Sequence, residues 1–229
     1  LDGVPHNEDG AGGMHVFMPW WLENANLDFP RGYHIEPWGG RRMPKFGSFS
    51  GIERYPSGGG WGQSLKEDYR RYYGAVVGLS GRGEMIPNAH SYCEIDPDTV
   101  DRWGIPVLRF SFQWNDHERL QSRHMQQTFR ELIDDMGGTS LTPEPNRENE
   151  FRLEPGGRII HEAGVTRMGH SADSSVLNAH CQAHEVKNLF VADGGPFVSQ
   201  ADKNLTWTIM ALAMRTGEHI ADMRNRGEL

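Results

Sequence analysis

The amino-acid sequence predicts an α+β fold, in which an antiparallel or mixed sheet accompanies one long helix and a strand–helix segment ends the chain. Short aromatic-rich runs that end in Pro or Gly indicate strands. Two stretches, one central and one near the C-terminus, repeat apolar residues at helical spacing. The 229 residues, of which 37% are hydrophobic and 24% charged, are enough for one large domain or two small ones.

The first half of the chain contains apolar or aromatic runs bounded by turn residues. Strands are expected there at 14–21, 32–40, 75–86, 90–95 and 105–112. The glycine-rich residues 39–62 show no periodicity and predict a long loop, which in a compact domain is usually a functional lid or disordered. Residues 63–74 predict a short helix that Gly74 closes.

The central helix is predicted over residues 115–138. Asn115 or Asp116 can cap its N-terminus, and Gly137 ends it. Its apolar stripe consists of Leu120, Met125, Phe129, Leu132 and Met136. A polar connection follows at 142–150, so we expect a domain boundary that divides the chain into residues 1–150 and 151–229.

The last third of the chain changes character. Residues 187–195 predict a buried apolar strand that runs into Asp-Gly-Gly, and Asn204 is expected to open a helix. One face of that helix carries Ile209, Leu212, Ala213, Thr216, Ile220 and Met223. A glycine turn beside a helix N-terminus often holds an anionic ligand group. This part of the chain therefore predicts a ligand site.

Composition excludes several classes of function. A formal net charge of −8 without a Lys/Arg run argues against nucleic acid and favours a small or neutral partner. Two cysteines argue against a disulfide framework. No apolar stretch approaches the roughly 20 residues that cross a bilayer, and no signal peptide is recognisable. The compartment stays open, since both a bacterial cytoplasm and a periplasm fit these features.

Metal, hydrolase and nucleotide motifs are weak. The C-terminal third holds possible metal ligands at His161, His170, His180, Cys181 and His184. They form no HExxH or CxxC pattern, so we expect loop histidines and no metal site. Two near-matches to G-x-S-x-G, at 78–82 and 169–173, lack the final glycine. Neither G-x-G-x-x-G nor a Walker A pattern occurs, so the chain has no dinucleotide fingerprint of its own.

The segment HEAGVTRMGH at 161–170, together with the C-terminal helix, resembles the C-terminal signature of glucose–methanol–choline (GMC) oxidoreductases. The matching residues are His161, Gly164, Met168, Gly169, Val176, Leu177, Asn178, Asn188, Leu189, Val191, Asp193, Gly194, Asn204, Thr206 and Thr208. Upstream, the stretches at 81–96 and 103–112 are similar to the strands that begin the family's C-terminal domain. Val165 and Leu205 depart from the pattern, because the family usually has Thr and Pro there.

The resemblance implies an FAD-dependent enzyme that oxidises the CH–OH group of an alcohol, polyol or sugar. The family's two catalytic positions map onto His161 as proton acceptor and Asn204 as its partner on the same substrate oxygen. A histidine with an ordinary pKa of about 6.5 suits proton abstraction, while hydride passes from carbon to flavin N5. Taken alone, Asn204 is simply a helix N-cap, and Asp193 with Gly194 is a strand-ending turn.

The resemblance also assigns parts of the chain to the cofactor. Asp193 and Gly194 would approach the flavin's ribityl and pyrophosphate groups, while the backbone N–H groups of Leu205 and Thr206 would face its pyrimidine ring. Residues 1–150 would form the substrate-binding domain, and 151–229 would complete the flavin site.

The resemblance implies that the family's glycine fingerprint lies in an N-terminal Rossmann part, and no such fingerprint occurs in these 229 residues. We therefore expect a C-terminal fragment or separately encoded half, whose partner is the N-terminal FAD-binding half. Bound FAD and activity could both be absent from the isolated chain. The alternative is a non-catalytic fragment that binds a ligand or a partner without flavin.

Overall fold

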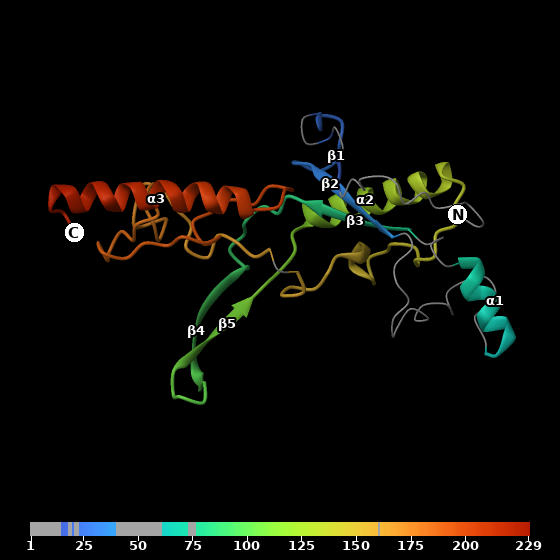
Figure 1. Cartoon of the computed structure of the whole chain (residues 1–229), viewed down its shortest axis with the longest axis horizontal. Helices are drawn as coiled ribbons and strands as arrows, with labels where there is room; N and C mark the ends of the chain where they lie inside the picture. Colours follow the sequence, from blue (N-terminus) through green and yellow to red (C-terminus); the bar gives the residue numbers. More distant parts are fainter. Residues whose placement is uncertain (1–14, 18–19, 21–22, 40–60, 73–76, 160) are drawn as a thin grey trace. The chain divides into compact units, whose positions relative to one another are not determined.

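The computed structural model describes residues 15–17, 20, 23–39, 61–72, 77–159 and 161–229 (Figure 1). The chain divides into two compact units, and neither is continuous in sequence. The first combines Leu1–Gly83 with Arg119–Leu153, and the second combines Glu84–Glu118 with Glu154–Leu229. The division expected from the sequence assigns substrate binding to residues 1–150 and completion of the flavin site to residues 151–229. It concerns function and stays a prediction.

The first unit contains a three-stranded antiparallel sheet in the order β1-β2-β3. Its strands are β1 (Val16–Phe17), β2 (Tyr33–Gly39) and β3 (Val77–Gly83). These strands confirm three of the predicted segments within the described residues. Most of the predicted loop at 39–62, together with Gly74, lies outside the described residues. The predicted short helix is present as α1 (Gln63–Tyr72).

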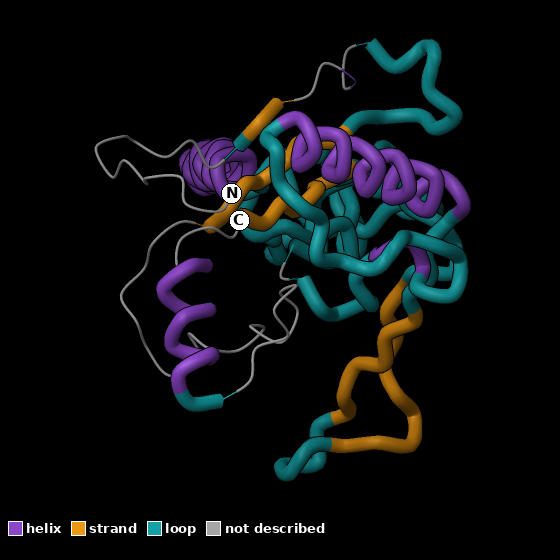
Figure 2. Tube along the Cα trace, turned by 90° about the vertical axis from the view of Figure 1, so that its right-hand side faces the viewer, coloured by secondary structure: helices purple, strands orange, loops and turns teal. Residues whose placement is uncertain are grey.

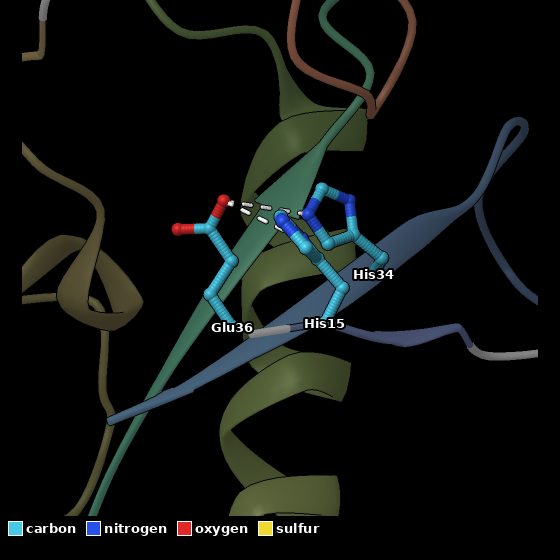
Figure 3. A group of neighbouring side chains, drawn as sticks. All are labelled: His15, His34 and Glu36. Atoms are coloured by element: carbon cyan, nitrogen blue, oxygen red, sulfur yellow. Dashed lines mark ion pairs between the residues drawn. The ribbon is translucent and has the colours of Figure 1, made fainter. Parts of the chain in front are cut away.

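The core of the first unit forms where α2 (Asp116–Asp135) packs on the sheet. Its buried members are Phe29, Tyr33, Ile35, Met125 and Phe129. Leu120 and Leu132 pack against this cluster, so the predicted apolar stripe of α2 is confirmed apart from Met136, which follows the helix and is exposed. Because side chains alternate across a strand, His34 and Glu36 project from the other face of β2 (Figure 3).

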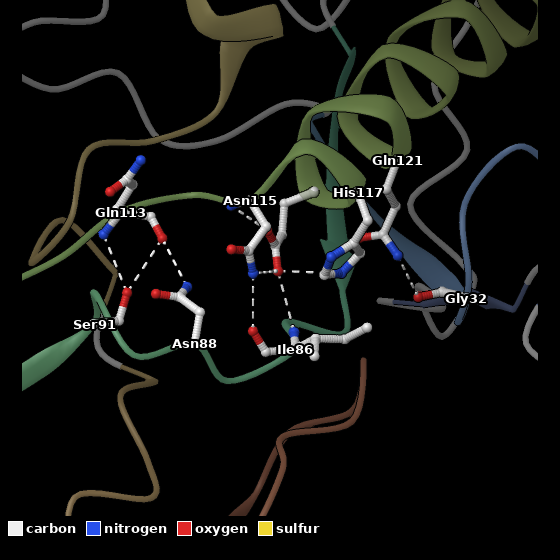
Figure 4. A network of polar contacts seen from close by, with 9 residues as sticks. Gly32, Ile86, Asn88, Ser91, Gln113, Asn115, His117 and Gln121 are labelled. Carbon is white, nitrogen blue, oxygen red and sulfur yellow. Dashed lines mark hydrogen bonds and ion pairs between the residues drawn. The ribbon is translucent and has the colours of Figure 1, made fainter.

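Two glycines of β3 let α2 lie close to the sheet. A Cβ atom at Gly81 would overlap the Met125 sulfur, and one at Gly83 would overlap the Gln121 carboxamide oxygen. Gln121 is itself fixed, because its Nε2 donates a hydrogen bond to the Gly32 carbonyl at 3.1 Å (Figure 4). Side chains at these two positions would therefore push the helix away or break a buried hydrogen bond.

Glu118 holds the start of α2. The Asn115 N–H donates to Glu118 Oε2 at 2.6 Å, the reciprocal half of a capping box, and the Ile86 N–H donates to Glu118 Oε1 at 3.1 Å (Figure 4). The Asn115 side chain donates instead to the Ile86 carbonyl at 3.2 Å. The predicted end of the helix is confirmed, since Gly137 has φ +69° and its N–H reaches the Asp134 carbonyl at 2.8 Å.

A left-handed turn, η3 (Glu150–Arg152), follows the polar connection. All three of its residues have positive φ although none is glycine, a conformation that costs roughly 1–2 kcal/mol per residue. Neighbours on α2 hold it in place. Arg119 forms a 2.8 Å ion pair with Glu150, and the Ser122 hydroxyl donates to the Phe151 carbonyl at 2.8 Å.

The second unit contains a β-hairpin and the C-terminal helix. The hairpin pairs β4 (Tyr92–Val100) with β5 (Pro106–Ser111), which confirms the last two predicted strands (Figure 2). The helix is α3 (Thr206–Arg226), and Thr216 and Met223 are buried on its predicted inner face. The buried core of this unit consists of Leu177, Cys181 and Ala183. Among the described helices, none is both long and apolar enough to span a membrane.

The strand predicted at 187–195 is wrong. This segment makes a single bridge, Gln182↔Phe190, whose two backbone hydrogen bonds run from Ala183 N–H to the Leu189 carbonyl and from Val191 N–H to the Cys181 carbonyl, both at 2.9 Å. The segment that pairs with it, around Gln182, consists of turns and is not a strand. A continuous ladder needs an extended partner, so apolar composition alone does not produce a strand here.

Candidate functional site

The two predicted catalytic side chains are in direct contact. His161 Nε2 lies 2.9 Å from Asn204 Oδ1, although the residues are 43 positions apart. His161 is half-buried and Asn204 is exposed at the surface of the described chain. With the amide oxygen toward the ring, Nε2–H donates the hydrogen bond; with the amide turned over, Nδ2–H donates to the Nε2 lone pair. The pair therefore accommodates either neutral tautomer of the ring.

Backbone hydrogen bonds place the His161 segment beside the glycine turn. The Gly164 N–H donates to the Gly194 carbonyl at 3.1 Å, and the Met168 N–H donates to the Pro196 carbonyl at 2.9 Å. Gly164 has φ +86°, a left-handed conformation that favours glycine. The two halves of the motif that are separate in sequence thus form one local structure.

The glycine turn has distinct requirements at its two positions. At Gly195, which is buried, a Cβ atom would overlap the Thr166 hydroxyl, so only glycine fits. At Gly194 a Cβ atom would lie 3.6 Å from the Glu162 carbonyl oxygen and 3.8 Å from Ile209 Cδ1, which are ordinary contacts. The described residues therefore leave room for a side chain at Gly194. The Asp193 carboxylate is exposed and accepts the Gly195 N–H at 2.7 Å.

The start of α3 differs from the prediction. Asn204 neither opens nor caps the helix: Leu205 is in the N-cap position, with φ −84° and ψ −20°, and no side chain caps it. The physical reason is that the Asn204 carboxamide is engaged with His161. Leu205 is buried and Thr206 is exposed. The first N–H groups of α3 are therefore available to an acceptor outside the described chain.

Thr166 is a residue of this site that sequence reasoning missed. Its hydroxyl is buried and makes no hydrogen bond with the described residues. It follows Val165, the position at which the chain departs from the threonine of the GMC signature. The sequence contains one clue to this residue. The threonine of the signature lies one position later in this chain, so the same turn still carries a hydroxyl group.

The C-terminal histidines do not assemble a metal site in the described residues. His184 Nε2 lies 2.9 Å from the Ser175 hydroxyl, and the His180 ring stacks on His219 with centroids 3.9 Å apart. The one group of metal-type ligands that meets in the described residues lies in the first unit and consists of His15, His34 and Glu36. Sequence reasoning missed it, although the alternation His34-x-Glu36 in a strand places both side chains on one face.

Glu36 is the charged member of the cluster formed by His15, His34 and Glu36. Its pKa is below the usual value because burial, which raises it, is outweighed by the Arg82 hydrogen bond and charge and by His34. Arg82 Nε donates to Glu36 Oε2 at 3.0 Å. Glu36 is therefore an ionised carboxylate at neutral pH, with one oxygen held by an arginine.

Comparisons with known proteins show the family to which the chain belongs. The model of the C-terminal domain of "GMC oxidoreductase" matches residues 87–213, more than half of the chain. The chain belongs to the GMC oxidoreductase family.

Curated relatives show what the chain is similar to. It is 29% identical over 161 residues to the 2-methyl-1,2-propanediol dehydrogenase of Mycolicibacterium austroafricanum, covering 70% of this chain and 28% of the relative. It is 26% identical over 166 residues to the fructose dehydrogenase large subunit of Gluconobacter japonicus, covering 72% and 29%. It is 32% identical over 161 residues to the C-glycoside 3-oxidase of Arthrobacter globiformis, covering 69% and 29%. The chain therefore spans less than a third of the length of these relatives.

Proposed function

We propose that this chain supplies the C-terminal part of the active site of an FAD-dependent oxidoreductase, which acts on a CH–OH group of an alcohol, polyol or sugar. The observation that carries the proposal is the 2.9 Å contact between His161 and Asn204. The relatives' names support the substrate class, since they include a diol dehydrogenase, a fructose dehydrogenase subunit and a glycoside oxidase.

The residues around the pair fit a flavin. Space beside Gly194, the exposed Asp193 carboxylate and the uncapped start of α3 lie in one unit with His161. Asp193 and Gly194 would receive the ribityl and pyrophosphate groups, and the N–H groups of Leu205 and Thr206 would stabilise negative charge on the pyrimidine ring. Bound FAD would supply the acceptor for the hydride that leaves the substrate carbon.

His161 and Asn204 would share the substrate hydroxyl between them. When the hydroxyl enters, it donates to His161 Nε2 and accepts from Asn204 Nδ2, so the direct contact between the two side chains opens. His161 then takes the hydroxyl proton, a step to which a positioned base contributes roughly 10²–10⁴-fold. The Asn204 carboxamide holds the oxygen as its negative charge grows. The exposure of Asn204 gives this rearrangement room.

The test is reduction of the flavin by substrate. The enzyme is assembled from this chain and the FAD-binding part, and flavin absorbance is followed after addition of an alcohol or sugar. His161→Ala should slow flavin reduction by about 10²-fold or more. His170→Ala, which changes an exposed histidine in the same segment, should leave the rate unchanged. Equal rates in both variants and the unmodified enzyme would show that His161 is not the base.

The alternative function is a non-catalytic fragment that binds a ligand or a partner without flavin. Exposed apolar surface gives it some support, because surfaces of that kind mark interaction sites. The two functions are separated by flavin titration of the assembled protein. Stoichiometric FAD binding with substrate-dependent bleaching supports the enzyme, whereas assembly without flavin supports the alternative.

The proposed partner is the N-terminal FAD-binding half of the enzyme. The outer face of α3 exposes Trp207 and Met214, with 84% and 71% of their surface accessible. One face of the hairpin likewise exposes Ile95, Leu108 and Phe110. Surfaces of this kind usually mark an interface. We propose that these apolar faces of α3 and the hairpin are covered by the part of a GMC enzyme that this chain does not span.

A further inference from the structure

The sheet of the first unit gathers two histidines and a glutamate at one place. In β2, His34 and Glu36 are two residues apart and project from the same face. The β1–β2 register pairs Phe17 with His34 and Val16 with Ile35, so one further step places His15 opposite Glu36. Strand pairing therefore brings together side chains from two segments that are distant in sequence, as Figure 3 shows.

The ligand atoms lie at distances that suit a shared ion. His34 Nε2 is 3.5 Å and His15 Nδ1 is 3.8 Å from Glu36 Oε1, and the three atoms lie within 4.8 Å of one another. Tetrahedral zinc with bonds of about 2.0–2.1 Å separates its ligand atoms by roughly 3.4 Å. Small movements of the side chains would therefore bring all three atoms onto one ion.

Burial and the neighbouring arginine shape the cluster further. His34 is 1% exposed, whereas the side chains of Glu36 and His15 are 20% and 29% exposed, which leaves a route for an ion from the His15 side. Arg82 binds Glu36 Oε2, so Oε1 is the oxygen turned toward the histidines. An outer partner of this kind orients a metal-binding carboxylate, although its positive charge also weakens cation binding.

We propose that His15 Nδ1, His34 Nε2 and Glu36 Oε1 form a binding site for a divalent transition metal ion, with Zn²⁺ as the best-matched ion. Two imidazoles and one carboxylate are a ligand set that such ions prefer, and three protein ligands leave a position for water or another small ligand. The ion would tie β1 to the sheet. The competing explanation is an ion-pair network in which Arg82 and the histidines share Glu36 without a metal.

The test measures binding of Zn²⁺ and Co²⁺ to the whole chain after treatment with a chelator. One tight Zn²⁺ per chain is expected by equilibrium dialysis, with visible Co²⁺ absorption typical of low coordination number. Glu36→Gln and His34→Ala should each weaken Zn²⁺ binding at least about tenfold. His90→Ala, an exposed histidine outside the cluster, should leave it unchanged. Absence of a stoichiometric site, or equal weakening by His90→Ala, overturns the proposal.

Two further variants keep the test decisive if a buried substitution prevents folding. His15→Ala removes a more exposed ligand, and its Zn²⁺ affinity should fall at least about tenfold while the circular dichroism of the chain is retained. Arg82→Gln removes a positive charge beside the carboxylate and should strengthen Zn²⁺ binding. If His15→Ala is folded and binds Zn²⁺ as well as the unmodified chain, the site is wrong.

Discussion

Asn204 contributes to the proposed site only through its carboxamide. Replacing it with alanine would remove the group proposed to hold the substrate oxygen, together with its hydrogen bond to His161. We expect Asn204→Ala to lower kcat by about 10²-fold, with a smaller effect on KM, because the lost hydrogen bond strengthens as charge develops. The measurement is steady-state turnover of the assembled enzyme. A variant with unchanged kcat and a raised KM would restrict Asn204 to substrate binding.

The environment of His124 predicts that the free energy of unfolding depends on pH. Burial is the largest cause that lowers its pKa, and its Nδ1 lies 2.8 Å from the Tyr33 hydroxyl in the core of the first unit. The unfolded chain therefore binds this proton more readily than the folded chain. Stability is retained above the unfolded pKa of about 6.5 and is lost as pH falls below it.

The measurement is the urea midpoint of unfolding at a series of pH values. The midpoint of the unmodified chain should fall between neutral and acidic pH, and His124→Gln should lose part of that dependence because its side chain does not titrate in this range. His90→Gln, which changes an exposed histidine, serves as the control. If both variants follow the unmodified chain, His124 is not the source of the effect.

Among whole elements, the contact between β3 and α2 depends on glycine. Gly83→Ala should destabilise the chain by about 1–3 kcal/mol, the usual cost of overpacking, since the new Cβ meets the fixed Gln121 side chain. Gly217→Ala is the matched control. It lies inside α3 with nothing close to its Cβ position, so alanine should stabilise by about 0.5–1 kcal/mol.

The free energy of unfolding, measured with urea, distinguishes the two glycines. Opposite signs for Gly83→Ala and Gly217→Ala would support close packing of α2 on β3. A neutral or stabilising effect of Gly83→Ala would mean that Gln121 moves aside without losing its bond to Gly32, and the packing argument would fail.

Elements with strong local signals could be predicted from the sequence. The inner face of α3 was predicted correctly because its helical spacing records burial directly, as Thr216 and Met223 show. The prediction of a strand at 187–195 was wrong because apolar residues indicate burial but not the presence of a pairing partner. The prediction that Asn204 caps the helix was wrong because its side chain contacts His161, a residue that is distant in sequence.

The candidate sites differ in the same way. The proximity of His161 and Asn204 followed from a motif whose order and spacing are specific. The His15, His34 and Glu36 cluster could not be predicted, because it depends on the pairing register of two strands. A shift of one residue would turn every side chain of β1 to the other face.

The exposed face of α3 predicts that the chain assembles with its proposed partner, the FAD-binding half. Met214 lies in the middle of the helix, is 71% exposed and follows Trp207 and Met210 on the same face. Met214→Glu should weaken association with the FAD-binding half at least about tenfold, because it places a charge in an apolar interface. Stability of the isolated chain should change by no more than about 0.5 kcal/mol, as for other surface substitutions.

Titration of the two parts, followed by flavin fluorescence or by sedimentation, measures this association. Asn225→Glu, in the polar last turn of the same helix, introduces the same charge and should leave the affinity unchanged. Equal weakening by both variants would indicate a general charge effect, because the chain already carries a net charge of −8. Unchanged affinity in Met214→Glu would mean that this face of α3 is not covered in the assembled enzyme, and the hairpin face with Phe110 would become the surface to test.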